Sequence, residues 1–252
     1  MNETTVGLNL LISDKFDPER DALADAFARR GGMVHRLGRF WDPPAFDPAT
    51  VRVYGADSFC LVLQQKLGFD LCSPADDLLL QVPSPFLQRQ LARRTLADVM
   101  SSLPAFVKPV VPKQFRGAVY SSPEDLAAEC RSLPQDTAVF VAEIVTLTAE
   151  VRSFVLDGQV LDAAVYEGTG SLADASKFVT ELVKAVRLPR AVVIDVGFFA
   201  DRGWAVIEFN SAWGSGLNGC DAMKALPAIL AASGRLTERL KTRPSQLLPN
   251  CE

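Results

Sequence analysis

The stretch from residue 192 to residue 210 constrains the fold more than any other part of the chain. Its sequence is V-V-I-D-V-G-F-F-A-D-R-G-W-A-V-I-E-F-N, with two apolar runs on either side of A-D-R-G. Apolar, β-branched and aromatic runs around such turn residues predict a β-hairpin. With a loop from Ala200 to Gly203, Asp195 lies opposite Glu208, and alternation along the second strand places Asn210 on the same face as Glu208.

Two carboxylates that face each other across a strand pair repel, so a nearly buried pair needs a compensating cation or proton. Carboxylate and amide oxygens without His or Cys suit a hard ion, and Mg²⁺ on substrate phosphates is commonly held by one or two carboxylates. The hairpin therefore predicts a magnesium site formed by Asp195, Glu208 and Asn210. The alternative is a surface hairpin whose acidic residues are simply solvated.

Composition limits the class of protein. A chain of 252 residues with 48% hydrophobic residues can bury a substantial core. The net charge of −4 argues against a general nucleic-acid or anionic-membrane surface, so we expect neither nucleic acid nor membrane as a partner. The first residues lack the basic segment and the long apolar run of a signal peptide or membrane span, which indicates a cytoplasmic protein.

Histidine and cysteine usage narrows the chemistry further. The single histidine, His35, leaves no basis for a Ser-His-Asp triad or a histidine-rich metal centre. The five cysteines contain no C-x-x-C pair, so neither a zinc knuckle nor a disulfide framework is indicated. We expect reduced thiols, with Cys220 as a packing residue rather than a nucleophile.

Changes of pattern along the chain predict three lobes. Residues 1–85 are expected to form a small α/β lobe, residues 86–142 a central lysine-bearing lobe, and residues 143–252 a C-terminal metal-binding lobe. In the first lobe we expect a strand from Val6 to Ile12, a helix from Pro18 to Arg30 and a strand from Met33 to Leu37, an order that favours a parallel sheet.

A helix is predicted from Ser84 and Pro85, which supply a cap and a first-turn proline, to about Ser102. It would carry Arg89, Arg93 and Arg94, either as a solvated basic face or as a substrate contact. The elements expected after it are two strands around the loop of residues 110–117, a helix over 122–133, strands over 138–145, 150–156 and 160–166, helices over 172–187 and 221–232, and a frayed polar tail after Arg235.

Three separated groups of charged residues need one explanation. They are the basic residues of the second lobe (Lys108, Lys113, Arg116), the charged strand-loop-strand that follows (Glu143, Glu150, Arg152), and the acidic hairpin. A nucleotide with its metal satisfies all three, because lysines complement phosphates and carboxylates hold the Mg²⁺ that bridges them. No G-x-x-x-x-G-K-[ST] loop and no G-x-G-x-x-G after the first strand occurs, which argues against a P-loop or Rossmann site.

From about Tyr54 to Asp221 the chain resembles the ATP-grasp superfamily, in particular a compact bacterial and phage-type branch similar to carboxylate–amine ligases. The resemblance is densest in F-V-K-P, in A-E-I-V-x-L-x-x-E-V-R-S-F-V-L-D-G and in V-I-E-F-N. It implies an α/β (α+β) fold in which a small N-terminal α/β lobe is followed by two α+β lobes that enclose the nucleotide. The segment S-A-W-G-S-G-L-N-G-C-D after Asn210 and the short loop at residues 167–170 depart from the larger family members.

The resemblance also implies residue roles. Lys108 and Lys113 look like the lysines that hold ATP phosphates, Glu143 with the backbone of Ile144 and Val145 like the adenine hinge, and Glu150 like the acid that supports the ribose or a phosphate-binding lysine. Arg152, with Lys113, matches the group that steadies the transferred phosphoryl, Arg116 is expected to contact the substrate, and Asp195, Glu208 and Asn210 match the metal ligands. The alternatives are surface charges for the lysines and a structural salt bridge of Arg152 with Glu150 or Glu143.

The resulting hypothesis is an ATP- and Mg²⁺-dependent ligase that joins a carboxylate to an amine, an amino acid or a peptide, through an acyl phosphate. Two alternatives stay open: a kinase that phosphorylates a small molecule, and a non-catalytic module that binds nucleotide.

Overall fold

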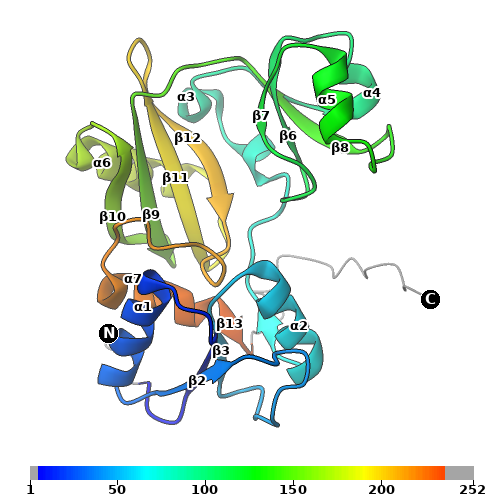
Figure 1. Ribbon diagram of the computed structural model, residues 1–252. Helices are drawn as coiled ribbons and strands as arrows, with labels where there is room; N and C mark the ends of the chain where they lie inside the picture. The colour runs from blue at the N-terminus through cyan, green and yellow to red at the C-terminus, as the bar shows by residue number, and fades with distance from the viewer. Residues whose placement is uncertain (1–4, 236–252) are drawn as a thin grey trace.

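The computed structural model describes residues 5–235 of the chain. Figure 1 shows two antiparallel sheets side by side in the upper half and a parallel sheet with its helices in the lower half. The prediction for the tail after Arg235 lies outside the described residues. Within the described residues, no helix has the length and apolar character needed to cross a bilayer.

The lower lobe is a three-stranded parallel sheet in the order β2-β1-β3. The predicted parallel arrangement is confirmed, although the first strand begins at Asn9 and not at Val6, because residues 6–7 form a turn. Asp17 caps α1 by accepting from the backbone N–H of Arg20 at 2.9 Å, and Gly68, with φ of 72°, ends α2. The elements are β1 (Asn9–Ser13), α1 (Pro18–Arg29), β2 (Met33–Leu37), β3 (Val51–Val53), α2 (Asp57–Leu67) and β4 (Asp70–Leu71).

The predicted long helix from Ser84 to Ser102 is wrong. A 3₁₀ turn, η1 (Leu78–Gln81), and a single helical turn, α3 (Ser84–Leu87), end at Gln88, whose φ of 52° breaks the helix. The chain continues as β5 (Leu91–Thr95), which pairs antiparallel with a later strand, and as α4 (Leu96–Val99), started by a capping box between Thr95 and Asp98. Arg93 and Arg94 therefore lie on a strand.

The upper right sheet has the order β5-β8-β6-β7, and all its pairs are antiparallel. The two predicted strands around the loop of residues 110–117 are confirmed as β6 (Ala105–Pro109) and β7 (Ala118–Tyr120). Helix α5 (Pro123–Glu129) follows, and its Leu126 packs into the core of this lobe beside Val107. Strand β8 (Ala138–Ala142) stops before Glu143, so the following residues form a link to the next sheet.

The upper left sheet, in the order β10-β9-β11-β12, carries the acidic hairpin (Figure 1). One face packs under α6, and its core includes Val151, Val155 and Ile194. Alternate residues such as Arg152 and Asp195 therefore lie on the opposite face. The elements are β9 (Ala149–Leu156), β10 (Gln159–Gly168), α6 (Leu172–Ala185), β11 (Ala191–Phe199) and β12 (Gly203–Asn210).

The end of the described chain returns to the first lobe. Helix α7 (Ala222–Ala231) lies against α1, and β13 (Ser233–Gly234) pairs with β4 (Figure 1). One hydrophobic core therefore joins residues of the first lobe, such as Phe27 and Leu63, to Leu226 and Ile229 of α7. The division at residues 85 and 142 stays a prediction.

Two glycines at the ends of β10 give a matched test of backbone space. Gly158 and Gly168 have φ of 75° and 68°. A Cβ on Gly158 would meet no atom within 4 Å, whereas a Cβ on Gly168 would lie 2.1 Å from the carbonyl oxygen of Thr148. We expect Gly158→Ala to lower the free energy of unfolding by about 1 kcal/mol through backbone strain. Gly168→Ala should lower it by about 3 kcal/mol, because neighbouring backbone must also move.

Urea unfolding followed by circular dichroism measures both losses. Equal losses in the two variants would contradict the contact with Thr148.

Candidate functional site

The hairpin formed by β11 and β12 has Asp195 opposite Glu208, as predicted. The loop is one residue shorter than expected, because Phe199 pairs with Gly203. A β-bulge at Ile207 restores the predicted register, since Val196 pairs with Val206 and Asp195 with Glu208. The pairing was therefore right although the loop length was not.

Asp195, Glu208 and Asn210 form one cluster. The side-chain nitrogen of Asn210 donates to Asp195 Oδ2 at 3.0 Å and to Glu208 Oε1 at 2.8 Å. No group of three or more His, Cys, Asp or Glu side chains within residues 5–235 could hold a metal. A metal here would thus depend on the two carboxylates together with the amide oxygen of Asn210.

Arg152 is the closest cation to Asp195. Its Nε and Nη2 donate to the two carboxylate oxygens of Asp195 at 2.9 and 2.7 Å, and the two side chains are 11% and 2% exposed. Burial raises the pKa of Asp195, and the guanidinium opposes that rise. Burial acts to lower the pKa of Arg152, but Asp195 outweighs it and the pKa is raised. The sequence alternative of a salt bridge with Glu150 or Glu143 thus named the wrong partner.

Lys108 reaches the cluster from the facing sheet. Its Nζ lies 3.4 Å from Glu208 Oε2 and 5.9 Å from the centre of the Phe140 ring. Burial acts to raise the pKa of Glu208, but Lys108 and the hydrogen bond from Asn210 outweigh it and lower the pKa. The structure therefore joins Lys108 and Arg152 to the three predicted metal ligands, with one cation beside each carboxylate.

The predicted hinge residue Glu143 is bound by an arginine that the sequence analysis missed. Arg202, in the β11–β12 turn, donates to both carboxylate oxygens of Glu143 at 2.7 and 3.0 Å, and its Nη1 also donates to the carbonyl of Gln88 at 3.0 Å. Hydrogen bonding to Arg202 lowers the pKa of Glu143. Ile144 is 47% exposed, so the link after Glu143 presents an open backbone segment.

An apolar surface lies beside this link. A Cβ on Gly197 would lie 2.6 Å from a methyl carbon of Leu147 and 3.0 Å from one of Ile207, so the absent side chain makes room for both. Glu150, on the neighbouring strand, accepts a hydrogen bond from the hydroxyl of Tyr166, another residue that the sequence analysis did not select.

Lys113 and Arg116 have other partners. Lys113, at φ of 66°, pairs with Asp57 at the first turn of α2 at 2.8 Å. The backbone of Arg116 bonds to Glu129 and Tyr120, and its guanidinium has no ion-pair partner in the described part of the chain. Neither side chain is bonded to the acidic cluster.

Arg89 is a buried cation at the edge of β12. Its Nη1 donates to the carbonyls of Leu87 at 3.0 Å and Val206 at 2.7 Å, and burial lowers the pKa of its guanidinium. The basic-helix interpretation placed it among Arg93 and Arg94 as one of three similar residues, but the structure separates it from them.

The loop of residues 211–221 closes the site from the side of the first lobe. Glu19 accepts from the backbone N–H groups of Leu217 and Asn218, both at 2.8 Å, and the Tyr54 hydroxyl donates to the carbonyl of Ser215 at 2.9 Å. The carbonyl of Gly216 accepts from Arg152 Nη1 at 2.9 Å. Sequence analysis missed Glu19 and Tyr54, because nothing local to either residue indicates a partner so far along the chain.

Cys220, in the same loop, is a packing residue as predicted. Its thiol lies 3.5 Å from the carbonyl oxygen of Arg152, and burial raises its pKa to about 12. The thiol is therefore protonated at neutral pH.

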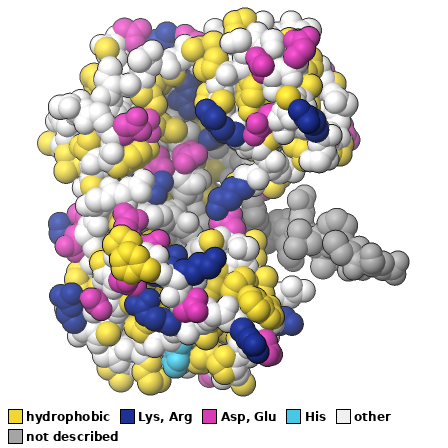
Figure 2. All heavy atoms as spheres, viewed as in Figure 1, with side chains coloured by type: hydrophobic (Ala, Val, Ile, Leu, Met, Phe, Trp, Pro, Cys, Tyr) yellow, Lys and Arg dark blue, Asp and Glu magenta, His cyan; other side chains and the backbone are white. Residues whose placement is uncertain are grey.

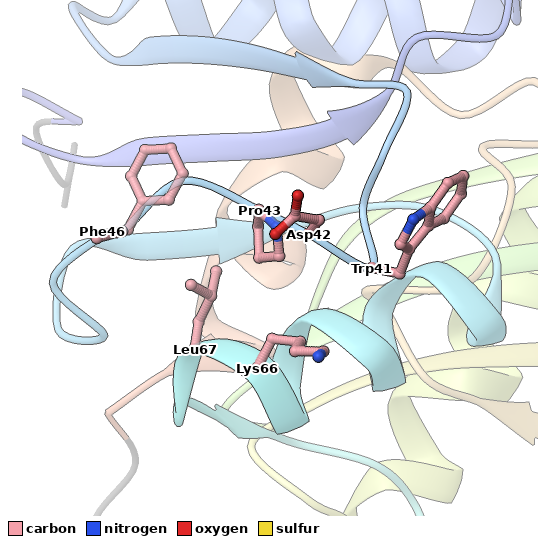
Figure 3. Close-up of a pocket in the computed structure, with 7 residues that line it drawn as sticks. Trp41, Asp42, Pro43, Phe46, Lys66 and Leu67 are labelled. Carbon is pink, nitrogen blue, oxygen red and sulfur yellow. The ribbon is translucent and has the colours of Figure 1, made fainter.

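Charged side chains of both signs border the hollow between the upper lobes and the lower lobe (Figure 2). A separate pocket of about 370 Å³ lies in the lower lobe and contains no predicted site residue (Figure 3). Its lining comprises Trp41, Asp42, Pro43, Ala45, Phe46, Lys66 and Leu67.

Solved structures with this architecture are ATP-grasp proteins. A RimK domain ATP-grasp protein from Sphaerobacter thermophilus matches 89% of this chain and 100% of its own, with a TM-score of 0.60 and 16% identity. N5-carboxyaminoimidazole synthase from Aspergillus clavatus matches 91% of this chain and 78% of its own, with a TM-score of 0.58 and 10% identity. D-cycloserine synthetase DcsG matches 93% and 100%, with a TM-score of 0.55 and 15% identity. The molecule thus has the ATP-grasp fold.

The sequence assigns the family within that fold. Residues 86–228, more than half of the chain, match the ATP-grasp domain that defines family 2 of a RimK-like clade, and the protein belongs to this family. ATP-grasp proteins are generally ATP-dependent carboxylate–amine ligases. No curated protein matches the sequence.

The two carboxylates should differ in their contribution to stability. Asp195→Asn leaves the buried Arg152 without its anion, so we expect the free energy of unfolding to fall by about 3 kcal/mol. Glu208→Gln disturbs a half-exposed pair with Lys108, and we expect a loss of about 1 kcal/mol or less. Guanidinium unfolding of both variants measures the difference, and equal losses would argue against the dominance of the Arg152 pair.

Proposed function

We propose that the protein is an ATP-dependent ligase that activates a carboxylate as an acyl phosphate and joins it to an amine. The observation that carries the proposal is the cluster of Asp195, Glu208 and Asn210, with Lys108 and Arg152 beside it. A phosphoryl-transfer site needs oxygen ligands for a divalent cation and fixed cations for the phosphate charge, and this cluster offers both.

Asp195, Glu208 and Asn210 are proposed to hold Mg²⁺. The fit rests on the hydrogen bonds of Asn210: one amide nitrogen donates to both carboxylates, so both carboxylates converge on one positive group. Rotation of the amide by half a turn would present its oxygen on the same side. When bound, Mg²⁺ would neutralise phosphate charge and hold the phosphates for in-line transfer.

The nucleotide is proposed to lie between the two antiparallel sheets. Lys108 would bind phosphate oxygens, and Lys113 would do so after release from Asp57, at a largely exposed ion pair that costs little to break. The backbone of Ile144 and Val145 would bind adenine above Leu147 and Ile207, with Glu143 held by Arg202. Glu150, fixed by Tyr166, would support the ribose or a phosphate-binding lysine.

The proposed reaction has two steps. A carboxylate oxygen of the substrate attacks the γ-phosphorus, the bond to the β-phosphate oxygen breaks, and ADP leaves. The amine then attacks the acyl carbon, the bond from carbon to the phosphate oxygen breaks, inorganic phosphate leaves and the amine loses a proton. Arg152 is proposed to steady the transferred phosphoryl group, and Asp195 orients Arg152 by holding two of its nitrogens.

The amine is proposed to belong to an amino acid or a peptide, with Arg116 contacting the substrate. Arg116 is a cation without an ion-pair partner among residues 5–235, which suits a carboxylate. One similar structure is that of the ATP-grasp ligase PsnB complexed with a precursor peptide and AMPPNP, with a TM-score of 0.50 and 14% identity.

Phosphate release from ATP and Mg²⁺, measured against pooled amino acids, peptides and small carboxylates with mass spectrometry of the products, tests the proposal. Added hydroxylamine should trap the acyl phosphate as a hydroxamate. Turnover that yields a phosphorylated alcohol and no hydroxamate would instead identify a kinase, and nucleotide binding without turnover would indicate a binding module.

Glu208→Ala should remove turnover, with a fall in kcat of about 100-fold or more, because the cation and the phosphate charge lose a ligand. Glu208 is preferable to Asp195 for this test, since Asp195 also neutralises Arg152. Glu181→Ala, on the exposed face of α6, is the control and should keep wild-type activity. Undiminished turnover in folded Glu208→Ala would refute the metal assignment.

A further inference from the structure

Arg152 is fixed by two parts of the chain. Asp195 of β11 binds its Nε and Nη2, and the carbonyl of Gly216 binds its Nη1. The strand supplies a rigid partner. The second partner is a loop carbonyl, so its position depends on whatever holds the loop.

Glu19 holds that loop. Its carboxylate lies in the first turn of α1, after Pro18, and accepts the backbone N–H groups of the consecutive residues Leu217 and Asn218 at 2.8 Å. Charge-assisted bonds of this length are the stronger kind. The fit is close, because a Cβ on Gly216 would lie 2.8 Å from Glu19 Oε2.

The loop has other anchors, but they act elsewhere. Tyr54 donates to the carbonyl of Ser215, and the Ser215 hydroxyl donates to the carbonyl of Ser211. Both leave the N–H groups at residues 217 and 218 without a partner if Glu19 is removed. Loss of Glu19 should therefore shift the segment after Ser215, which includes the Gly216 carbonyl, while the fold persists.

We infer that Glu19 is a positioning residue for phosphoryl transfer, acting from the first lobe through the Gly216 carbonyl on Arg152. The inference rests on the proposed function, since it assumes that Arg152 steadies the transferred group. It predicts an effect on kcat rather than on ATP binding, because the Lys108 and hinge contacts proposed for ATP do not involve this loop.

The test compares Glu19→Ala and Glu19→Gln with a matched control, Glu124→Ala. Glu124 also follows a first-turn proline, in α5, but it is exposed and remote from the loop. Glu19→Ala should lower kcat about tenfold or more with the KM for ATP within about twofold. Glu19→Gln, which keeps one acceptor oxygen, should lower kcat less, and Glu124→Ala should keep wild-type values.

The decisive readout is a double-mutant cycle with Arg152→Lys, in which the bidentate hold on Asp195 is lost. If Glu19 acts through Arg152, Glu19→Ala should cause little further loss of kcat in the Arg152→Lys background. Independent, multiplying losses would overturn the inference, as would wild-type kcat in Glu19→Ala, while the proposed function would stand. Absence of ATP turnover in the wild type with every acceptor would overturn both.

Discussion

The ion pair between Arg152 and Asp195 is the interaction on which the site depends. Asp195 lies on the central strand β11, with Glu208 on one side and Arg152 on the other. Without the guanidinium, two carboxylates would face each other at a buried position, which is unfavourable. With Arg152 beside Asp195 and Lys108 beside Glu208, each carboxylate can stay charged while the pair stays close. The sheet thus keeps an acidic surface intact before any ligand is bound.

The lobes meet at a small number of polar contacts. The two segments that join the antiparallel sheets, near Gln88 and Glu143, are both bound by Arg202 from the hairpin turn. The first lobe reaches the same hairpin through Glu19 and Tyr54, which bind the loop after β12. Both connections end on the hairpin that carries the acidic cluster or on the loop that follows it, so movement between lobes is coupled to the geometry of the cluster.

Sequence reasoning succeeded where the signal was local. The alternation of β11 and β12 predicted that Asp195 faces Glu208, and caps and glycines located α1 and α2. It failed at residues 84–102, because a cap and a first-turn proline mark where a helix begins but not how far it runs, and pairing of β5 with β8 overrode the helical expectation. It also missed Glu19, Arg202 and Tyr166, whose partners are set by tertiary packing. The roles given to the predicted site residues come from resemblance and stay predictions.

The return of α7 to the first lobe has a consequence for how the chain folds. Residues of β1, α1 and α2 share one core with α7, although nearly the whole of the two upper lobes separates them in the sequence. During synthesis from the N-terminus, the parallel sheet emerges first but lacks part of its apolar covering until α7 has emerged. The lobe that is made first is therefore the last to be complete, and its exposed apolar face is the part of the nascent chain most in need of protection from aggregation.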